Sequence, residues 1–169
     1  SLPSFDLHVP LLSVPRILGA GWPAIPNRVP YLSPPPDVTF DAAPEAGSRL
    51  KVGIVWGGNP AHQNDRGRSM PLAAWAPLFA LDHIAFSSLQ VGARAAELKN
   101  LALGGRVLDL GERLTDFYST AAAIAQLDLV IGVDTAVIHL AGALAKPVWL
   151  LLPYAPDGRW LLDRDDSPW

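Results

Sequence analysis

The sequence predicts a doubly wound, Rossmann-like parallel α/β fold, preceded by a proline-rich irregular segment. From Leu50 onward, short apolar runs alternate with stretches of helical pattern, which is typical of βα repeats. The apolar runs contain few polar residues, as strands do when helices cover both faces of a sheet. Half of the residues are hydrophobic and 17% are charged, which favours a well-buried globular domain.

The first 36 residues contain nine of the 17 prolines, so we expect extended segments and turns there, without a long helix or a central strand. The three prolines at 34–36 indicate a stiff linker. We therefore divide the chain into residues 1–44 and a Rossmann-like domain over residues 45–169. The chain starts without methionine and stops before an expected sixth strand, so we interpret it as a fragment of a longer protein.

Five apolar runs have the length and composition of strands, and the first of them ends in glycines: 50–58, 84–90, 106–111, 127–133 and 146–152. Four stretches between them have a helical pattern: 72–81, 93–103, 115–127 and 134–145. Pro71 suits a helix start, and Thr115 is a suitable N-cap. The residues from Pro153 onward read as a loop with one helical turn.

Composition excludes several classes of protein. A net charge of −3 and a pI of about 5.7 argue against a nucleic-acid partner. Without cysteine there are no disulfides or thiolate metal sites, and the four histidines lack metal-ligand spacing. No apolar run reaches about 18 residues, so we expect no membrane span. No signal peptide is visible, which makes the cytoplasm the expected location.

Two polar clusters follow strands that a doubly wound sheet places side by side. Gly57, Gly58 and Asn59 follow the first strand, and Asp134 and Thr135 follow the fourth. In the strand order 3-2-1-4-5, ligands bind beyond the carboxyl ends of these strands, where the order reverses. Glycines there allow a tight turn and a close approach of the backbone to a ligand. A plain turn is the alternative interpretation.

The segment after the fourth strand has the features of a phosphate site. We expect Asp134 to cap the next helix, and Thr135 and Ala136 to present N–H groups at the positive end of its dipole. His139 follows Thr135 by four residues, so it shares a helix face and leans toward the same ligand. Two alternatives stay open: Asp134 as a cap alone, and His139 as a core histidine bonded to the backbone.

Other polar residues complete the candidate site. Arg66 and Arg68 lie in a long polar loop and can neutralise a diphosphate, although a solvated loop is the alternative. Gln90 ends the second strand, where it can touch a ribose or a base, and Asp116 begins the helix after the third strand. Three aromatic residues are candidates for stacking on a ring: Tyr154, Trp160 and Trp169.

Familiar nucleotide and hydrolase motifs are absent. Glycines at 53, 57 and 58 with Gln90 do not make the dinucleotide fingerprint, which needs Gly-x-Gly-x-x-Gly and an acid after the second strand. The sequence also lacks the phosphate loop Gly-x-x-x-x-Gly-Lys-Ser/Thr and the nucleophile elbow Gly-x-Ser-x-Gly. The candidate site must therefore hold its ligand in another way.

Three segments resemble the C-terminal half of bacterial glycosyltransferase family 9 domains, which are heptosyltransferase-like and often follow tetratricopeptide repeats. These segments are KVGIVWGGNPAHQNDRGRSMPL, FSSLQ and DLVIGVDTAVIHLAGALAKPVWLLLPYAPDGRWLLDRDDSPW. The first residues are similar to the end of the N-terminal half and the crossover. The resemblance implies a GT-B architecture, in which two Rossmann-like halves face each other across a cleft.

The resemblance also implies a function. The C-terminal half binds a nucleotide-diphosphate sugar, with Asp134, Thr135, Ala136 and His139 matching the motif that holds the donor. One arginine of the 66/68 pair takes the place of a basic phosphate contact that is often lysine. No metal or other cofactor is expected, and the general base and acceptor site belong to the N-terminal half. We therefore expect a glycosyltransferase whose fragment alone is inactive.

Two alternatives use the same features. A nucleotide-sugar epimerase of GT-B fold would need the same diphosphate site but would release an epimerised sugar. A non-catalytic interaction module derived from a transferase would bind no nucleotide.

Overall fold

A computed structural model describes residues 4–19, 27–34, 36–43, 49–101, 103, 105–161, 164 and 166–167. Five parallel strands form one sheet in the order β3-β2-β1-β4-β5. The strands are β1 Leu50–Val55, β2 Ile84–Ser88, β3 Val107–Asp109, β4 Leu129–Val133 and β5 Val148–Leu151. This topology confirms the predicted fold class and strand order.

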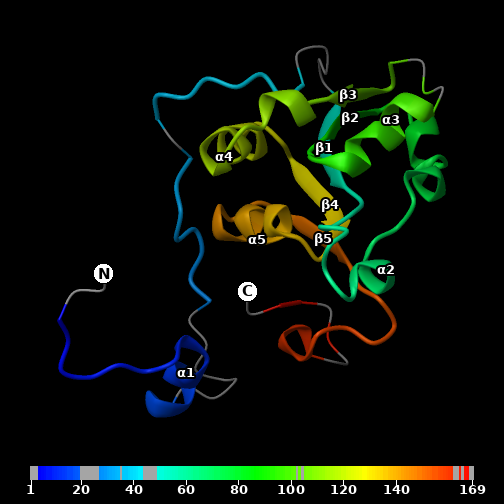
Figure 1. Cartoon of the computed structure of the whole chain (residues 1–169). Coiled ribbons are helices and arrows are strands. Elements are labelled where there is room, and N and C mark those ends of the chain that lie inside the picture. Colours follow the sequence, from blue (N-terminus) through cyan, green and yellow to red (C-terminus); the bar gives the residue numbers. More distant parts are fainter. Residues whose placement is uncertain are drawn as a thin grey trace.

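Helices cover both faces of the sheet. The helices are α1 Val14–Ile17, α2 Asp65–Arg68, α3 Ala96–Asn100, α4 Phe117–Ala125 and α5 Ala136–Ala143. The 3₁₀ turns are Leu11–Ser13, Leu72–Trp75, Leu78–Ala80, Ala93–Ala95, Gly111–Arg113 and Gly158–Trp160. Figure 1 shows α4 and α5 on one side of the sheet and α3 on the other. None of the helices in the described part of the chain is both long and apolar enough to cross a membrane.

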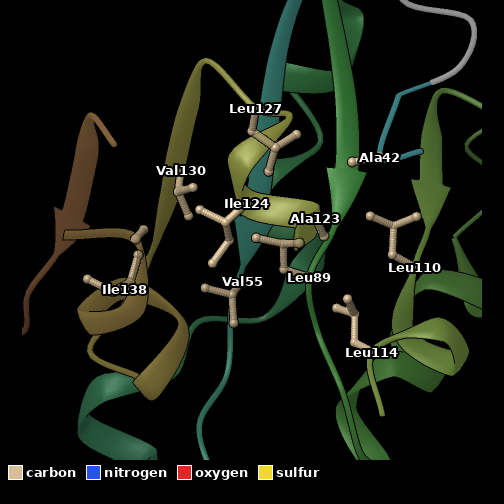
Figure 2. Packing of buried hydrophobic residues seen from close by; sticks show 11 residues of the cluster. Ala42, Val55, Leu89, Leu110, Leu114, Ala123, Ile124, Leu127, Val130 and Ile138 are labelled. Carbon is tan, nitrogen blue, oxygen red and sulfur yellow. The ribbon is translucent and has the colours of Figure 1, made fainter. Parts of the chain in front are cut away.

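Two apolar clusters fill the space between the sheet and its helices. On one side, Val55 and Val130 pack with Ile124 of α4 and Ile138 of α5 (Figure 2). A second cluster joins other strand residues to α3 and the 3₁₀ turns: Val52, Ile54, Leu72, Trp75, Phe79, Phe86 and Leu98. Neighbouring strand residues alternate between the two clusters because side chains alternate across a strand. Burial on both faces explains the nearly continuous apolar strands.

Two predicted helices are shorter or more broken than their patterns indicated. The stretch 72–81 forms two 3₁₀ turns, because Pro77 has no N–H to donate and its ring disfavours a continuous helix. The stretch 93–103 forms the turn Ala93–Ala95 followed by α3, which ends at Asn100. The predicted N-cap at Thr115 is also wrong, since the N-cap is Asp116 and α4 begins at Phe117.

The proline-rich segment contains only short helical pieces in its described residues, as predicted. Its later part lies against the domain. The N–H groups of Tyr31 and Leu32 donate to the carbonyl of Ala143 at the end of α5. Ala42 is buried, and its carbonyl accepts a 2.5 Å hydrogen bond from Ser87 Oγ. The predicted boundary at 44/45 lies outside the described residues.

Candidate functional site

The loops after β1 and β4 meet at the switch point of the sheet. Gly57 and Gly58 follow β1, Asp134 and Thr135 follow β4, and the two strands are paired. Arg68, at the end of α2, joins the loops because its Nη1 donates to the backbone carbonyl of Asp134 at 3.2 Å. The predicted meeting of the two clusters is therefore present, and Arg68 lies between them.

The turn after β1 is held by the buried side chain of Gln90. Its Oε1 accepts from the N–H groups of Trp56 and Gly57 at 3.1 and 2.9 Å. Its Nε2 donates to the carbonyls of Gly57 and Val91 at 3.0 and 3.1 Å. Both polar atoms of the amide are thus committed to the backbone. The prediction that Gln90 touches a ribose or a base is wrong, because Gln90 shapes the turn instead.

A buried carboxylate organises the loop that carries Arg68. Asp65 is 4% exposed, and its oxygens accept from Ser69 Oγ at 2.7 Å and Arg94 Nη2 at 2.5 Å. Ser69 Oγ in turn accepts from the N–H of Gly58 at 3.0 Å. Arg68 Nε lies 3.8 Å from Asp65. Asp65 therefore connects the glycine turn to both arginines.

Two arginine side chains lie over the glycine turn. A Cβ at Gly57 would collide with Arg94, and a Cβ at Gly58 would collide with Arg68. Arg94 is also held by Glu97, whose Oε1 lies 3.4 Å from Arg94 Nη1. The two glycines therefore allow close approach, as expected, but in this structure the protein's own cations occupy the space.

The carboxylate of Asp134 does not cap α5, so that prediction is wrong. Thr135 takes the N-cap position, with an extended backbone and no side-chain cap bond. Asp134 Oδ2 instead accepts from Arg159 Nη2 at 2.6 Å and from Trp160 Nε1 at 3.0 Å. Its Oδ1 lies 3.3 Å from His139 Nε2. The carboxylate is thus directed toward the turn Gly158–Trp160, and it does not accept from the first N–H groups of α5.

His139 leans toward the start of α5, as its helical position predicted. Its ring stacks on Trp160, with 5.2 Å between centroids and 21° between planes. The His139 side chain is 39% exposed, so it is not the buried core histidine of the alternative interpretation. Trp160 therefore stacks within the protein, whereas Tyr154 is fully exposed and Trp169 lies outside the described residues.

Three predicted residues are not part of this cluster. Arg66 is exposed, and no hydrogen bond or ion pair joins it to the cluster in the described part of the chain. Asn59 is exposed and accepts from the N–H of Ala61 at 3.0 Å. Asp116 is the N-cap of α4, and it forms a capping box with Ser119. Asn59 and Asp116 thus stabilise local turns, which is what short polar side chains do at such positions.

The N-terminus of α5 has the features of an anion site. Helical geometry leaves the first N–H groups of α5 without intrahelical partners, at the positive end of the dipole. Thr135 Oγ1 is buried and, within the described residues, has no hydrogen-bond partner. Ala136 is exposed, so the end of the helix is accessible. Together with Arg68, these groups can bind a phosphate or a carboxylate.

A cavity of about 750 Å³ lies beside α5 and β5. His139 and Trp160 form part of its wall, together with Gly142 and Trp149. Its volume lies within the range of small-molecule sites. The cavity therefore adjoins the cluster around Asp134. No group of three or more possible metal ligands occurs among the residues that the structure describes.

Sequence reasoning missed four residues of the cluster: Asp65, Ser69, Arg94 and Arg159. Asp65 and Ser69 lay in a polar loop with nothing to separate them from solvated neighbours. Arg94 lies 29 residues from its partner Asp65, and Arg159 lies 25 residues from Asp134. The sequence offered one signal for Arg159, its position next to Trp160. A tryptophan in a terminal loop often anchors that loop on the domain, and a neighbouring arginine can pack on its ring.

Two of the buried carboxyls have pKa values below the ordinary 3.8. Burial raises the pKa of Asp65, but hydrogen bonds from Arg94 and Ser69 and the charges of Arg94 and Arg68 outweigh it. Burial likewise raises the pKa of Asp134, and hydrogen bonds from Trp160 and Arg159 more than compensate. Both carboxylates are therefore held in the charged form.

These shifts predict the direction of acid denaturation. A carboxyl with a lowered pKa in the folded state stabilises the fold above its unfolded pKa, and this contribution disappears as pH falls. We expect the free energy of unfolding to be constant from pH 7 to about 5, and to decrease below about pH 4. Urea unfolding between pH 7 and 2.5 measures this. Asp134→Asn should reduce the acid-dependent decrease, and an unchanged decrease would contradict its assignment.

Comparison with known proteins adds the family. Residues 93–160 match the model described as glycosyltransferase family 9 (heptosyltransferase). Over these residues the chain is similar to glycosyltransferase family 9. The family 9 segment contains β3 to β5 together with the cluster residues Arg94, Asp134, His139 and Trp160. It confirms the resemblance over these residues and makes this a glycosyltransferase-like domain.

The relatives are longer than this chain. Protein FlbA of Caulobacter vibrioides is 31% identical in an alignment 138 residues long, which covers 76% of this chain and 23% of FlbA. The E. coli heptosyltransferase WaaC with ADP is 21% identical with a TM-score of 0.52, over 65% of this chain and 35% of WaaC. The E. coli heptosyltransferase WaaC with ADP-2-deoxy-2-fluoro heptose is also 21% identical, with a TM-score of 0.51, over 75% of this chain and 36% of WaaC. This chain thus spans about a quarter of FlbA and a third of WaaC.

Proposed function

We propose that this chain is the donor-binding domain of a glycosyltransferase, and that it holds the diphosphate of a nucleotide sugar at the N-terminus of α5. The observation that carries the proposal is the hydrogen bond from Arg68 to the carbonyl of Asp134. It keeps a guanidinium at the positive end of a helix, so two sources of positive potential converge. The heptosyltransferase solved with ADP-2-deoxy-2-fluoro heptose supports a donor of this class.

The same groups suit the chemistry of sugar transfer. The bond between the anomeric carbon and the diphosphate oxygen breaks, and the acceptor oxygen forms a new bond to that carbon. Negative charge develops on the leaving diphosphate, where Arg68 and the N–H groups of α5 stabilise it. These fixed cationic groups provide the charge without a metal ion. The cavity beside His139 offers room for a sugar next to the diphosphate.

The acceptor and the general base belong, in this proposal, to a second half of the same protein. That half would face the carboxyl ends of the strands, where Arg68 and Thr135 lie, as in a GT-B arrangement of two Rossmann-like halves. The proton of the acceptor hydroxyl would pass to a base on that half. Residues of this chain would bind and orient the donor and stabilise the leaving group.

Calorimetry on the intact protein tests donor binding. We expect one nucleoside diphosphate among ADP, UDP and GDP, and its sugar conjugates, to bind selectively. Thr135→Val removes the buried hydroxyl with little change in shape, and it should weaken binding about 3- to 10-fold. Thr115→Val, on an exposed threonine, is the matched control and should leave affinity unchanged. Absence of nucleotide binding to the intact protein would contradict the proposal and favour an interaction module.

A further inference from the structure

We infer that Arg159 and Trp160 are positioning residues, which keep the N-terminus of α5 open for an anion by holding the carboxylate of Asp134 away from it. This inference rests on the proposed function, because it concerns the same anion site. It assigns a role to the turn Gly158–Trp160, in which Arg159 lies 25 residues after Asp134 in the sequence.

Asp134 would otherwise compete with a bound phosphate. It directly precedes Thr135, the N-cap of α5, and an aspartate at the start of a helix ordinarily accepts from the first N–H groups. The helix dipole attracts a carboxylate to the same place as a phosphate. A carboxylate there would occupy those donors, and its charge would repel the incoming anion. The sequence alone favoured this arrangement, and the structure does not adopt it.

Two donors hold the carboxylate elsewhere. Arg159 Nη2 and Trp160 Nε1 both donate to Asp134 Oδ2, at 2.6 and 3.0 Å. Asp134 is 8% exposed, so water competes little for these bonds. Arg159 is a charged donor, whereas the N–H groups of a helix end are neutral, so the pair with Arg159 adds an attraction between two full charges. They account for a carboxylate that lies beside α5 without capping it.

The turn that carries the two donors is itself fixed. Trp160 is 5% exposed and stacks on His139 of α5. The guanidinium of Arg159 lies 5.5 Å from the centre of the Trp160 ring. Asp157 Oδ1 accepts from the N–H of Arg159 at 3.0 Å, which caps the turn. The position of the Asp134 carboxylate thus depends on side chains packed around it, including His139 of α5, and not on the backbone N–H groups at the start of that helix.

The experiment measures binding of inorganic pyrophosphate and ADP to variants of the intact protein by calorimetry. Arg159→Gln frees the carboxylate of Asp134, and we expect both ligands to bind about 5- to 20-fold more weakly. Arg159→Gln combined with Asp134→Asn removes the competing charge, and binding should return to within about 2-fold of Asp134→Asn alone. Trp160→Phe keeps an aromatic ring, although a smaller one, and removes the N–H, so it should act in the same direction as Arg159→Gln.

Arg106→Gln is the matched control, since Arg106 pairs with the exposed Asp82 away from the cavity, and the affinity of this variant should not change. Circular dichroism of every variant checks that the fold is retained. If the double variant binds as weakly as Arg159→Gln, Arg159 contacts the anion directly and the inference is overturned. Unchanged binding by Arg159→Gln overturns it too. If neither ligand binds the unaltered protein, the proposed function fails, and this inference with it.

Discussion

Replacing Arg68 with glutamine should weaken the binding of ADP to the intact protein about 10- to 100-fold. Arg68 is the cation that the structure places between the two loops of the site, with Nη1 on the carbonyl of Asp134. A hydrogen bond to a charged group contributes about 1.5–3 kcal/mol, and glutamine keeps neither the charge nor the fork geometry. Calorimetry at two salt concentrations measures both the affinity and the loss of one ionic contact.

Arg66→Gln is the matched control for this experiment. Arg66 belongs to the same short helix, α2, but it is exposed and lies outside the cluster. We expect its affinity for ADP to stay within about 2-fold of the unaltered protein. Arg68→Lys should retain part of the affinity, because it keeps the charge without the planar fork. Equal losses for Arg66→Gln and Arg68→Gln would contradict the assignment, since they would indicate a diffuse electrostatic effect.

Replacing Asp65 with asparagine should lower the free energy of unfolding by about 2–4 kcal/mol. Asp65 is buried, and its carboxylate accepts from both Arg94 and Ser69. Asparagine has the same shape but lacks the charge, so among the described residues it leaves the guanidinium of Arg94 with Glu97 as its one acidic partner. Breaking one side of a buried pair costs more than the pair itself contributes. Urea unfolding at pH 7 measures the loss.

Asp82→Asn provides the comparison. Asp82 pairs with Arg106 at 2.8 Å, but the Asp82 side chain is 87% exposed. Surface pairs of this kind contribute at most about 1 kcal/mol, so we expect a change below that value. A loss for Asp65→Asn no larger than that for Asp82→Asn would show that the buried network does not stabilise the loop. The loss of ADP affinity in Asp65→Asn should accompany the loss of stability, because Asp65 also orients the loop bearing Arg68.

The sequence was most informative where one local feature fixes the outcome. Alternating apolar and helical patterns predicted five parallel strands, because strands buried on both faces must be continuous and apolar. The order assumed for a doubly wound sheet agrees with the structure. It was less informative about helix ends. Apolar content in the stretch 72–81 suggested one helix, but Pro77 divides it into two turns. Thr115 and Asp116 are both good caps, and local pattern cannot choose between neighbours.

The candidate site also has parts that the sequence predicted and parts that it did not. Gly57, Asp134 and Thr135 were located from the sequence, because the topology of a doubly wound sheet fixes which loops meet. The partners of their side chains were not predictable. Gln90 was expected to face a ligand, and it binds the backbone of the glycine turn instead. Asp65 lay in a loop whose residues gave no sign of burial.

The sequence by itself thus determined the fold class and, with the strand order assumed for that class, the loops that form the site, since these follow from hydrophobic pattern and the handedness of βα units. Tertiary structure decided which charges pair. Asp134 has the local signature of a helix cap, but Arg159 and Trp160 approach it from 25 and 26 residues away and take its carboxylate. The Asp134 carboxylate is mostly buried, and Arg159 offers it a full positive charge where the helix end offers neutral N–H groups. Because Arg159 and Trp160 are distant from Asp134 in the sequence, the three side chains come together only once the chain has folded.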